Sequence, residues 1–216
     1  MKRLILQTYV VDNVERDTIN TYKRFPKLER LSRQQFKRYA KLHGADYEFF
    51  NPEEGQAHWI RMIMFDMPEY DEILYVDCDI LIHPSRFKDN IFDYVGNFVP
   101  KIWAFPVCNQ VPGVEWPNHP SGDFNAGVMK VGKREAEQMK KYINNYYHPT
   151  HNQSALNECW KKHIGPWREL PYKFNVTHRP CKDTVFRHYA GLHKICLLYT
   201  SPSPRDRTRS RMPSSA

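Results

Sequence analysis

The chain has 216 residues, of which 41% are apolar and 26% charged, enough core material for one globular domain or two small ones. This composition excludes disordered and fibrous proteins, and no apolar run approaches the ~18 residues that span a bilayer. Residues 1–6 start like a signal peptide, but Gln7 and Thr8 interrupt the apolar stretch. Five scattered cysteines without a CxxC pair indicate neither a disulfide framework nor a zinc site. We therefore expect a soluble, cytoplasmic protein.

The net charge of +8 raises the question of nucleic-acid binding, yet part of it lies in residues 196–216. This Ser/Pro/Arg-rich segment has no apolar periodicity, and its composition predicts disorder. Its back-translation resembles a transposase-end sequencing adapter, so we expect residues 1–195 to form the domain and the native chain to be cut off near residue 195. Without the four arginines and one aspartate of this tail the charge is +5. A basic Ser/Arg arm for nucleic acid is the alternative, and we expect no nucleic-acid partner.

The first third of the chain predicts strands and helices in alternation. Ser32, followed three residues later by Gln35, forms a capping box, and Gly44 supplies a stop, which together predict a helix over about residues 32–43. Apolar residues at helical spacing predict a second helix over about residues 57–67. Runs rich in apolar, β-branched and aromatic residues predict strands over 4–11, 46–50 and 72–76.

The middle of the chain adds a long candidate binding loop. Residues 106–122 carry four prolines and a tryptophan, too long and too structured in composition for a simple connector. Around this loop we expect strands over 102–105 and 127–131, and helices over 133–146 and 153–163. The alternation of strands and helices predicts one α/β domain with a Rossmann-like, mixed and mostly parallel sheet flanked by helices.

Two carboxylates, Asp77 and Asp79, lie one residue apart at the end of the strand over 72–76. Apolar neighbours and mutual repulsion disfavour two ionised carboxylates, so both stay charged only beside a cation. Mg²⁺ or Mn²⁺ suits such oxygen ligands and leaves positions for phosphate oxygens. Open α/β sheets also bind ligands beyond the carboxyl ends of their strands. The alternative is a pair of loop aspartates that cap a turn.

The segment around Asp77 and Asp79 resembles the DxD motif of GT-A glycosyltransferases. Together with four further segments, in order over residues 58–194, it is similar to glycosyltransferase family 8, which includes glycogenins and bacterial lipooligosaccharide galactosyltransferases. The resemblance implies a single GT-A domain. Arg61, 16 positions before Asp77, lies where the family places a basic residue near the donor phosphates. A solvated helix face is the alternative for Arg61.

Residues 123–129 (DFNAGVM) resemble the F-N-[SA]-G-V segment of the family. The resemblance implies that Asn125, Ala126 and Gly127 line the donor sugar, and the absence of a side chain at Gly127 lets backbone approach a ligand closely. The alternative is a tight start of a strand.

Residues 152–157 (NQSALN) resemble the D-Q-x-x-L-N helix start, which in the family faces the anomeric carbon. Asn152 replaces the Asp of the family, so an amide stands where a carboxylate holds the donor sugar hydroxyls. Gln153 lies at the position of the family's glutamine. Because an amide is a poor base, this residue favours front-face attack with retention of the anomeric configuration. An inverting enzyme would need a carboxylate base, for which Asp123 or Glu115 could serve. A plain helix N-cap at Asn152 is the alternative.

Residues 188–194 (HYAGLHK) resemble the H-x-x-G-x-x-K motif of the family in full. The resemblance implies that His188 is a third metal ligand, that Gly191 permits close passage of backbone and that Lys194 meets the pyrophosphate. Imidazole suits Mn²⁺ beside carboxylates. A structural histidine is the alternative.

Together these resemblances imply transfer of a hexose from a UDP sugar to the hydroxyl of a glycan or other acceptor, assisted by Mn²⁺ or Mg²⁺ at Asp77, Asp79 and His188. Membrane association is left undecided. Aromatic faces suit apolar sugar surfaces. The candidates for acceptor stacking, which are also candidates for core packing, are Trp103, Trp116, Trp160, Trp167 and Tyr172.

Other functions stay open. One is a different GT-A transferase or a nucleotidyltransferase, although residues 10–27 lack the glycine-rich phosphate loop of the latter. Another is a nucleotide-sugar-binding protein without turnover, favoured by Asn152, and a third is a basic binding module.

Overall fold

The computed structural model describes residues 1–8, 25–50, 60–94, 103–106, 124–146, 152–165, 168–176 and 182–189. Most of the candidate loop over 106–122 and the whole tail over 196–216 lie outside these residues. The described strands and helices, in chain order, are β1 (Arg3–Thr8), α2 (Phe25–Leu42), β2 (Asp46–Phe50), η1 (Ile60–Asp66), β3 (Glu72–Asp77), β4 (Ile80–Ile82), η2 (Pro84–Arg86), η3 (Ile91–Tyr94), β5 (Trp103–Pro106), β6 (Phe124–Gly132), α3 (Lys133–Tyr142), η4 (Ile143–Tyr146), α4 (Asn152–His163), β7 (Arg168–Glu169), η5 (Tyr172–Phe174) and β8 (Phe186–His188).

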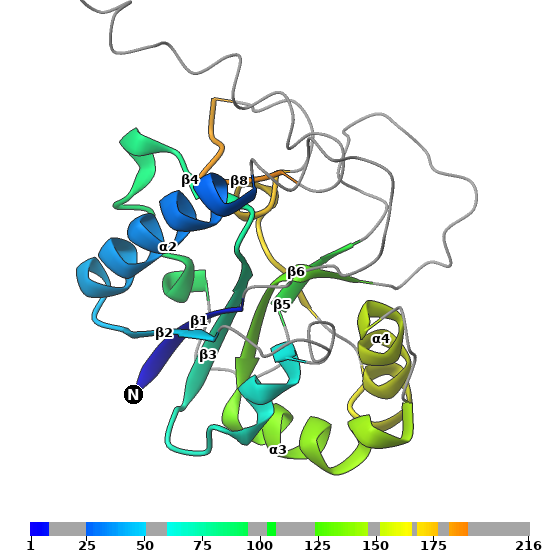
Figure 1. Cartoon of the computed structure of the whole chain (residues 1–216). Helices are drawn as coiled ribbons and strands as arrows, with labels where there is room; N and C mark the ends of the chain where they lie inside the picture. Colours follow the sequence, from blue (N-terminus) through cyan, green and yellow to red (C-terminus); the bar gives the residue numbers. More distant parts are fainter. Residues whose placement is uncertain are drawn as a thin grey trace, which may run out of the picture.

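A six-stranded sheet in the order β2-β1-β3-β6-β5-β7 forms the centre of the described part of the chain (Figure 1). Strand β1 pairs in parallel with β2 and β3, and β5 pairs in parallel with β7. Strand β6 is antiparallel to both of its neighbours, β3 and β5. The sheet is therefore mixed and mostly parallel, as the alternation of strands and helices predicts.

Both faces of the sheet are covered, which explains why its central strands are apolar almost throughout. Successive side chains of a strand point to opposite faces. Ile5, Leu74 and Val128 accordingly belong to the core beneath α2, together with Phe36 of that helix. Leu4, Leu6, Ile73, Tyr75 and Met129 belong to the core on the other face, which η1, α3 and α4 cover with Met64, Met139 and Trp160.

A second sheet of two strands, β4 and β8, follows the carboxyl end of β3 (Figure 1). The strands are antiparallel, with Ile80 opposite His188 and Ile82 opposite Phe186. Helix α2 packs against β4, and Gln35 accepts a hydrogen bond of 2.7 Å from the backbone N–H of Ile82. This ribbon brings the end of the described chain back beside the end of β3.

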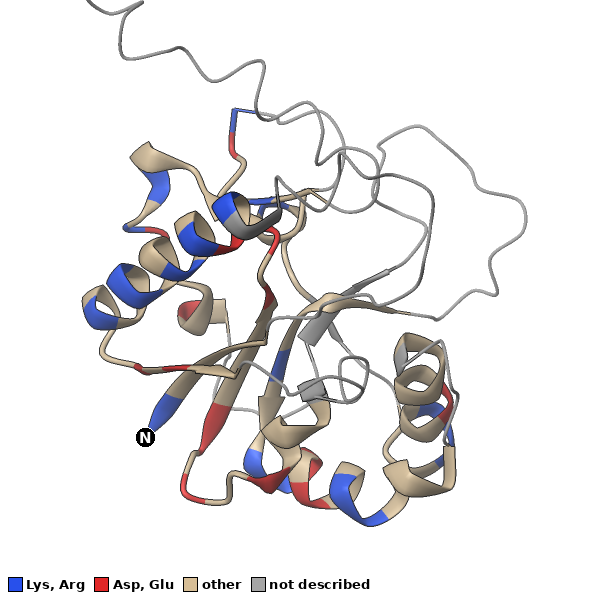
Figure 2. Cartoon of the chain, viewed as in Figure 1, with Lys and Arg blue, Asp and Glu red and all other residues tan. Residues whose placement is uncertain are grey.

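The charged residues follow the amphipathic pattern of α2. Figure 2 shows lysine and arginine spread along this helix, and the exposed ones are Lys27, Arg30, Arg33, Lys37, Arg38 and Lys41. In the described part of the chain, none of the helices combines the length with the apolar character that crossing a membrane requires.

Several predicted elements are confirmed, with changed boundaries. The strands expected over 46–50, 72–76 and 127–131 are present, the last as part of the longer β6, and the helix expected over 153–163 begins one residue earlier. The segment expected as a helix over 57–67 is a 3₁₀ helix over Ile60–Asp66, and the one over 133–146 turns from α to 3₁₀ after Tyr142.

The predicted capping box at Ser32 is wrong, because α2 already begins at Phe25. Ser32 lies inside the helix, fully buried, and its Oγ accepts a hydrogen bond of 2.9 Å from Gln7 Nε2. Gln35 bonds to β4 rather than back to the helix start. Both side chains thus make tertiary contacts that local spacing does not reveal.

Candidate active site

The two aspartates lie where β3 ends and the chain turns into β4. Asp77 is the last residue of β3, and Asp79 directly precedes Ile80, the first residue of β4. Asp79 is only 6% exposed, whereas Asp77 is partly exposed. Both carboxylates therefore sit at the carboxyl edge of the main sheet, where ligands of open α/β sheets bind.

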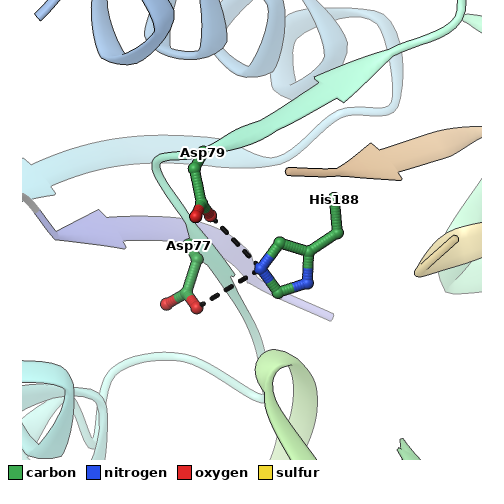
Figure 3. A group of neighbouring side chains, drawn as sticks. All are labelled: Asp77, Asp79 and His188. Carbon is green, nitrogen blue, oxygen red and sulfur yellow. Dashed lines mark ion pairs between the residues drawn. The ribbon is translucent and has the colours of Figure 1, made fainter. Parts of the chain in front are cut away.

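His188 meets both carboxylates from β8, far along the chain. Pairing of Ile80 with His188 sets the ring beside the turn, and the N–H of Tyr189 donates a bond of 3.0 Å to the carbonyl of Asp79. His188 Nε2 lies 3.3 Å from Asp79 Oδ1 and 3.9 Å from Asp77 Oδ2 (Figure 3). These three residues were grouped by the sequence motifs, and the fold brings them together.

A set of buried polar groups holds Asp77 in place. The hydroxyl of Tyr75 donates a bond of 2.8 Å to Asp77 Oδ1 and lies 3.0 Å from Thr8 Oγ1. Gln7 Nε2 donates a bond of 3.3 Å to the carbonyl of Asp77. With Oδ1 bonded to Tyr75, the other carboxylate oxygen of Asp77 faces His188.

Gly127 on β6 packs against the same cluster. A Cβ at this position would lie 2.5 Å from His188 Cε1, 2.9 Å from Asp77 Oδ2 and 3.0 Å from Asn125 Oδ1. Distances this short leave no room for a side chain, so only glycine fits beside the carboxylate and the imidazole.

Helix α4 is tied to the start of β6 through amide side chains. Gln153 Oε1 accepts a bond of 3.0 Å from the N–H of Ala126, and Asn157 Oδ1 accepts one of 2.7 Å from the N–H of Phe124. Asn157 Nδ2 donates to the carbonyls of Phe124 and Gln153 at 2.9 Å each. The segment with Ala126 and Gly127 therefore connects the helix start at Gln153 to the Asp–Asp–His cluster.

The donor set fits a divalent cation. One oxygen each from Asp77 and Asp79 and one nitrogen from His188 lie within 4.8 Å of one another. Carboxylate oxygens are preferred by Mg²⁺ and Mn²⁺, and imidazole is compatible with Mn²⁺. Among the described residues this is the one group of three such side chains.

Tyr189 follows His188 at the end of β8, and burial raises the pKa of its phenol, while the nearby Arg187 acts in the opposite direction. The tyrosine is therefore neutral at physiological pH.

For the other predicted site residues, the structure describes either the backbone alone or nothing. Arg61 is in η1 and Asn152 begins α4, but only their backbone is described. Asp123, Gly191 and Lys194 lie outside the described residues, so their roles remain predictions.

Of the aromatic residues named for acceptor stacking or core packing, Trp160 belongs to the core, because its side chain, on α4, is fully buried. Tyr172 is partly buried in η5, and the side chains of Trp103, Trp116 and Trp167 lie outside the described part of the chain.

Several residues that support the cluster were not predicted from the sequence. Gln7 and Thr8 are polar and buried at the carboxyl end of β1, directly after the apolar run 4–6, a signal that sequence alone could have given. Asn175, whose Oδ1 lies 2.8 Å from His188 Nδ1, gave no such signal, because it stands in an irregular segment.

Comparison with known proteins finds similarity in fold alone. No protein-family model and no curated protein sequence matches the chain. The crystal structure of a glycosyltransferase involved in the glycosylation of the major capsid of PBCV-1 matches with a TM-score of 0.59 at 16% identity, over 89% of this chain and 96% of that one.

The glycosyltransferase GlyE of Streptococcus pneumoniae TIGR4 also matches, again at 16% identity. Its apo form has a TM-score of 0.56 over 89% of this chain, and a second structure has 0.57 over 98%. The present chain spans 55% and 61% of those two chains. The protein thus has the α/β, GT-A-like fold of these glycosyltransferases, with an Asp–Asp–His cluster at the carboxyl edge of its sheet.

Proposed function

We propose that this protein is a metal-dependent glycosyltransferase that transfers a hexose from a nucleotide diphosphate sugar to an acceptor hydroxyl. The observation that carries the proposal is the convergence of Asp77, Asp79 and His188 at the end of β3, in a fold that solved glycosyltransferases share. The resemblance of the surrounding segments to glycosyltransferase family 8 makes UDP the expected nucleotide.

Charge on the leaving group is the central chemical problem of this reaction. Negative charge collects on the pyrophosphate as its bond to the sugar breaks, and a bound Mn²⁺ or Mg²⁺ supplies a Lewis acid that neutralises it. Asp77, Asp79 and His188 would hold that ion. Lys194 and Arg61 are proposed to add positive charge near the same phosphates.

The sugar is proposed to lie over the start of β6. Asn125, Ala126 and Gly127 belong to the segment whose family counterparts line the donor sugar. The contact of Gln153 with the N–H of Ala126 places the start of α4 beside that segment. Asn152, next in the same helix start, offers hydrogen bonds to sugar hydroxyls without a negative charge.

Retention of the anomeric configuration is the proposed outcome. The amide of Gln153 is a poor base, which favours front-face attack by the acceptor hydroxyl. An inverting reaction would require a carboxylate base, for which Asp123 is the alternative. The anomer of the product, determined by NMR, separates the two.

A nucleotide-sugar-binding protein with weak turnover is the second candidate, because Asn152 stands where the family has a carboxylate. It would bind UDP with metal yet release little sugar from any UDP-hexose. Hydrolysis or transfer assays with a panel of UDP-hexoses separate it from an active transferase. The acceptor is proposed to be a glycan or another hydroxyl compound.

The test is calorimetric titration of the full chain with UDP, with and without Mn²⁺. Binding that requires Mn²⁺, and that is lost when Asp79→Asn removes one carboxylate, is the expected result. UDP binding that is indifferent to the metal and to this substitution would contradict the metal site. A folded protein that binds no UDP under either condition would contradict the UDP-sugar donor.

A further inference from the structure

A chain of hydrogen bonds runs from the backbone of β6 to the imidazole of His188. The N–H of Gly127 donates to Asn125 Oδ1 at 2.9 Å, and Asn175 Nδ2 donates to the same oxygen at 3.2 Å. Asn175 Oδ1 lies 2.8 Å from His188 Nδ1. Asn175 is fully buried and His188 nearly so, which shields the contact between these two side chains from water.

The directions of these bonds follow from one fixed donor. A backbone N–H can only donate, so the side-chain atom of Asn125 that faces Gly127 is its oxygen. The atom of Asn175 that meets this oxygen must then be its NH₂ group. The oxygen of Asn175 therefore faces His188, and an oxygen acceptor requires that His188 Nδ1 carry a proton.

We propose that Asn175 is a positioning residue that fixes the tautomer and ring orientation of His188 for metal binding. This inference rests on the proposed metal site. A histidine that binds a metal through Nε2 keeps its proton on Nδ1 and commonly donates it to an oxygen acceptor. Asn175 supplies that acceptor, and Nε2 thereby faces Asp77 and Asp79.

Backbone pairing explains why Asn175 lies beside His188. The following residue, Val176, forms a parallel bridge with Arg187. Its N–H donates to the carbonyl of Phe186, and its carbonyl accepts from the N–H of His188, both at 3.0 Å. The segment after η5 is thus attached to β8, which fixes the distance between the amide of Asn175 and the imidazole.

The orientation of Asn175 is set from a third element. Without Asn125 the amide of Asn175 could rotate and present its NH₂ group to His188. The bond from Gly127 identifies the Asn125 atom at this contact as the oxygen Oδ1, which can only accept hydrogen bonds. Asn175 must therefore turn its NH₂ group towards Asn125. The segment proposed to line the donor sugar therefore also determines which ring nitrogen of the metal ligand carries the proton.

Nuclear magnetic resonance of the full chain, labelled with ¹⁵N-histidine and free of metal, tests the hydrogen-bond chain directly. We expect Nδ1 of His188 to be protonated, with a slowly exchanging proton, and this signal to disappear in Asn175→Ala. An unprotonated Nδ1 in the wild type, or the same slowly exchanging proton in Asn175→Ala, would overturn the proposal.

Titration with Mn²⁺ alone measures the consequence for metal binding. Loss of a partner that orients a metal-binding histidine typically weakens metal affinity about 10–100-fold, which is the effect expected for Asn175→Ala. Asn175→Asp keeps an oxygen acceptor for His188 but turns its second oxygen towards Asn125 Oδ1, so its Mn²⁺ affinity should lie between those of the wild type and Asn175→Ala. Wild-type affinity in Asn175→Ala would overturn the proposal.

Tyr39→Phe is the matched control for stability. Tyr39 is also fully buried, and its hydroxyl accepts from the N–H of Ile91 and donates to the carbonyl of Asp89, away from the cluster. Its loss should destabilise the fold and leave Mn²⁺ affinity unchanged. If Tyr39→Phe weakened Mn²⁺ binding as much as Asn175→Ala, the effect would follow stability, and the positioning role would be overturned.

The two proposals fail in different ways. A wild-type chain that shows the Nδ1 proton but takes up neither Mn²⁺ nor Mg²⁺ would overturn the metal site, and the positioning role with it. A chain that binds Mn²⁺ while Nδ1 of His188 is unprotonated would overturn the positioning role alone.

Discussion

Gly127 and His188 pack so closely that a Cβ at position 127 would lie 2.5 Å from His188 Cε1. The two residues belong to different sheets, β6 in the main sheet and β8 in the small one. Their contact therefore packs the ring of His188 against the main sheet, where its Nε2 faces the carboxylates of Asp77 and Asp79. The close packing of Asp77, Asp79 and His188 therefore requires glycine at position 127.

Gly127→Ala should therefore damage the site. The added methyl group would also lie 2.9 Å from Asp77 Oδ2, so either the imidazole or the carboxylate must move. We expect Mn²⁺ affinity to fall by at least about tenfold and the free energy of unfolding by about 1–3 kcal/mol. Mn²⁺ titration and urea unfolding of the same preparation measure the two effects.

Gly44→Ala is the control for this substitution. Gly44 has a φ of +66°, and a methyl group added to it would meet nothing within 4 Å, so the cost is backbone strain of about 1–2 kcal/mol without a clash. Mn²⁺ affinity should stay at the wild-type value. Equal losses of affinity in both variants would show that it follows stability rather than the contact with His188.

The Asp–Asp–His cluster could be predicted only in part from local sequence. Asp77 and Asp79 follow an apolar strand directly, and the cost of burying two like charges marks them as a cation site. His188 was identified only because its segment resembles a family motif, since no local pattern links β8 to β3. Asn175 was missed because its role arises from the bridge of Val176 to Arg187, a tertiary contact.

The fold was predictable where elements are periodic and was misread where side chains bond across elements. The strand over 46–50 has the expected bounds, because aromatic residues in a short run favour a strand. The start of α2 was misplaced because Ser32 bonds to Gln7 on β1. The strands β4, β7 and β8 are two or three residues long, too short for a period to show.

Asp79→Asn tests the charge of the proposed metal site. The amide removes a negative charge and leaves the size of the side chain almost unchanged. We expect kcat/KM for UDP-sugar turnover to fall about 100-fold or more, equivalent to about 2.7 kcal/mol of transition-state stabilisation. Asp183→Asn is the control, because its exposed carboxylate pairs with Arg86 at the surface. Wild-type turnover by Asp79→Asn would remove this residue from the metal site.

A buried ion pair at the other end of β3 predicts unequal effects on stability. Glu72 lies 3.0 Å from Lys130 Nζ and 3.0 Å from Arg3 Nε, and Lys130 is almost fully buried. Burial lowers the pKa of Lys130, and the carboxylate of Glu72 opposes this shift. The lysine therefore depends on Glu72 to remain charged in the core.

Glu72→Gln should lower the free energy of unfolding by about 3–5 kcal/mol, because it leaves a buried cation without its carboxylate. Lys130→Met should cost less than half of that, since Glu72 keeps its contact with Arg3 and the methionine fills apolar space. Urea unfolding at pH 7 measures both. Equal costs would mean that Arg3 does not compensate for the loss of Lys130.

The alkaline stability of the fold should depend on Tyr39. Burial raises the pKa of its phenol well above the usual value of about 10. Above about pH 10 the unfolded chain releases this proton and the folded chain keeps it, so stability falls as pH rises, by about 1.4 kcal/mol per pH unit for each such group. Tyr47 adds to the same effect, because burial raises its pKa as well.

Tyr39→Phe separates the hydrogen bonds of this residue from its titration. At pH 8 the variant should be less stable by about 1–3 kcal/mol, because the buried N–H of Ile91 loses its acceptor. Above about pH 10 the free energy of unfolding of the variant should fall less steeply than that of the wild type. The difference in slope should be that of one titrating group, about 1.4 kcal/mol per pH unit. Urea unfolding at pH 8, 10 and 11 supplies the comparison. Parallel pH profiles of the two proteins would show that Tyr39 already ionises in the folded state.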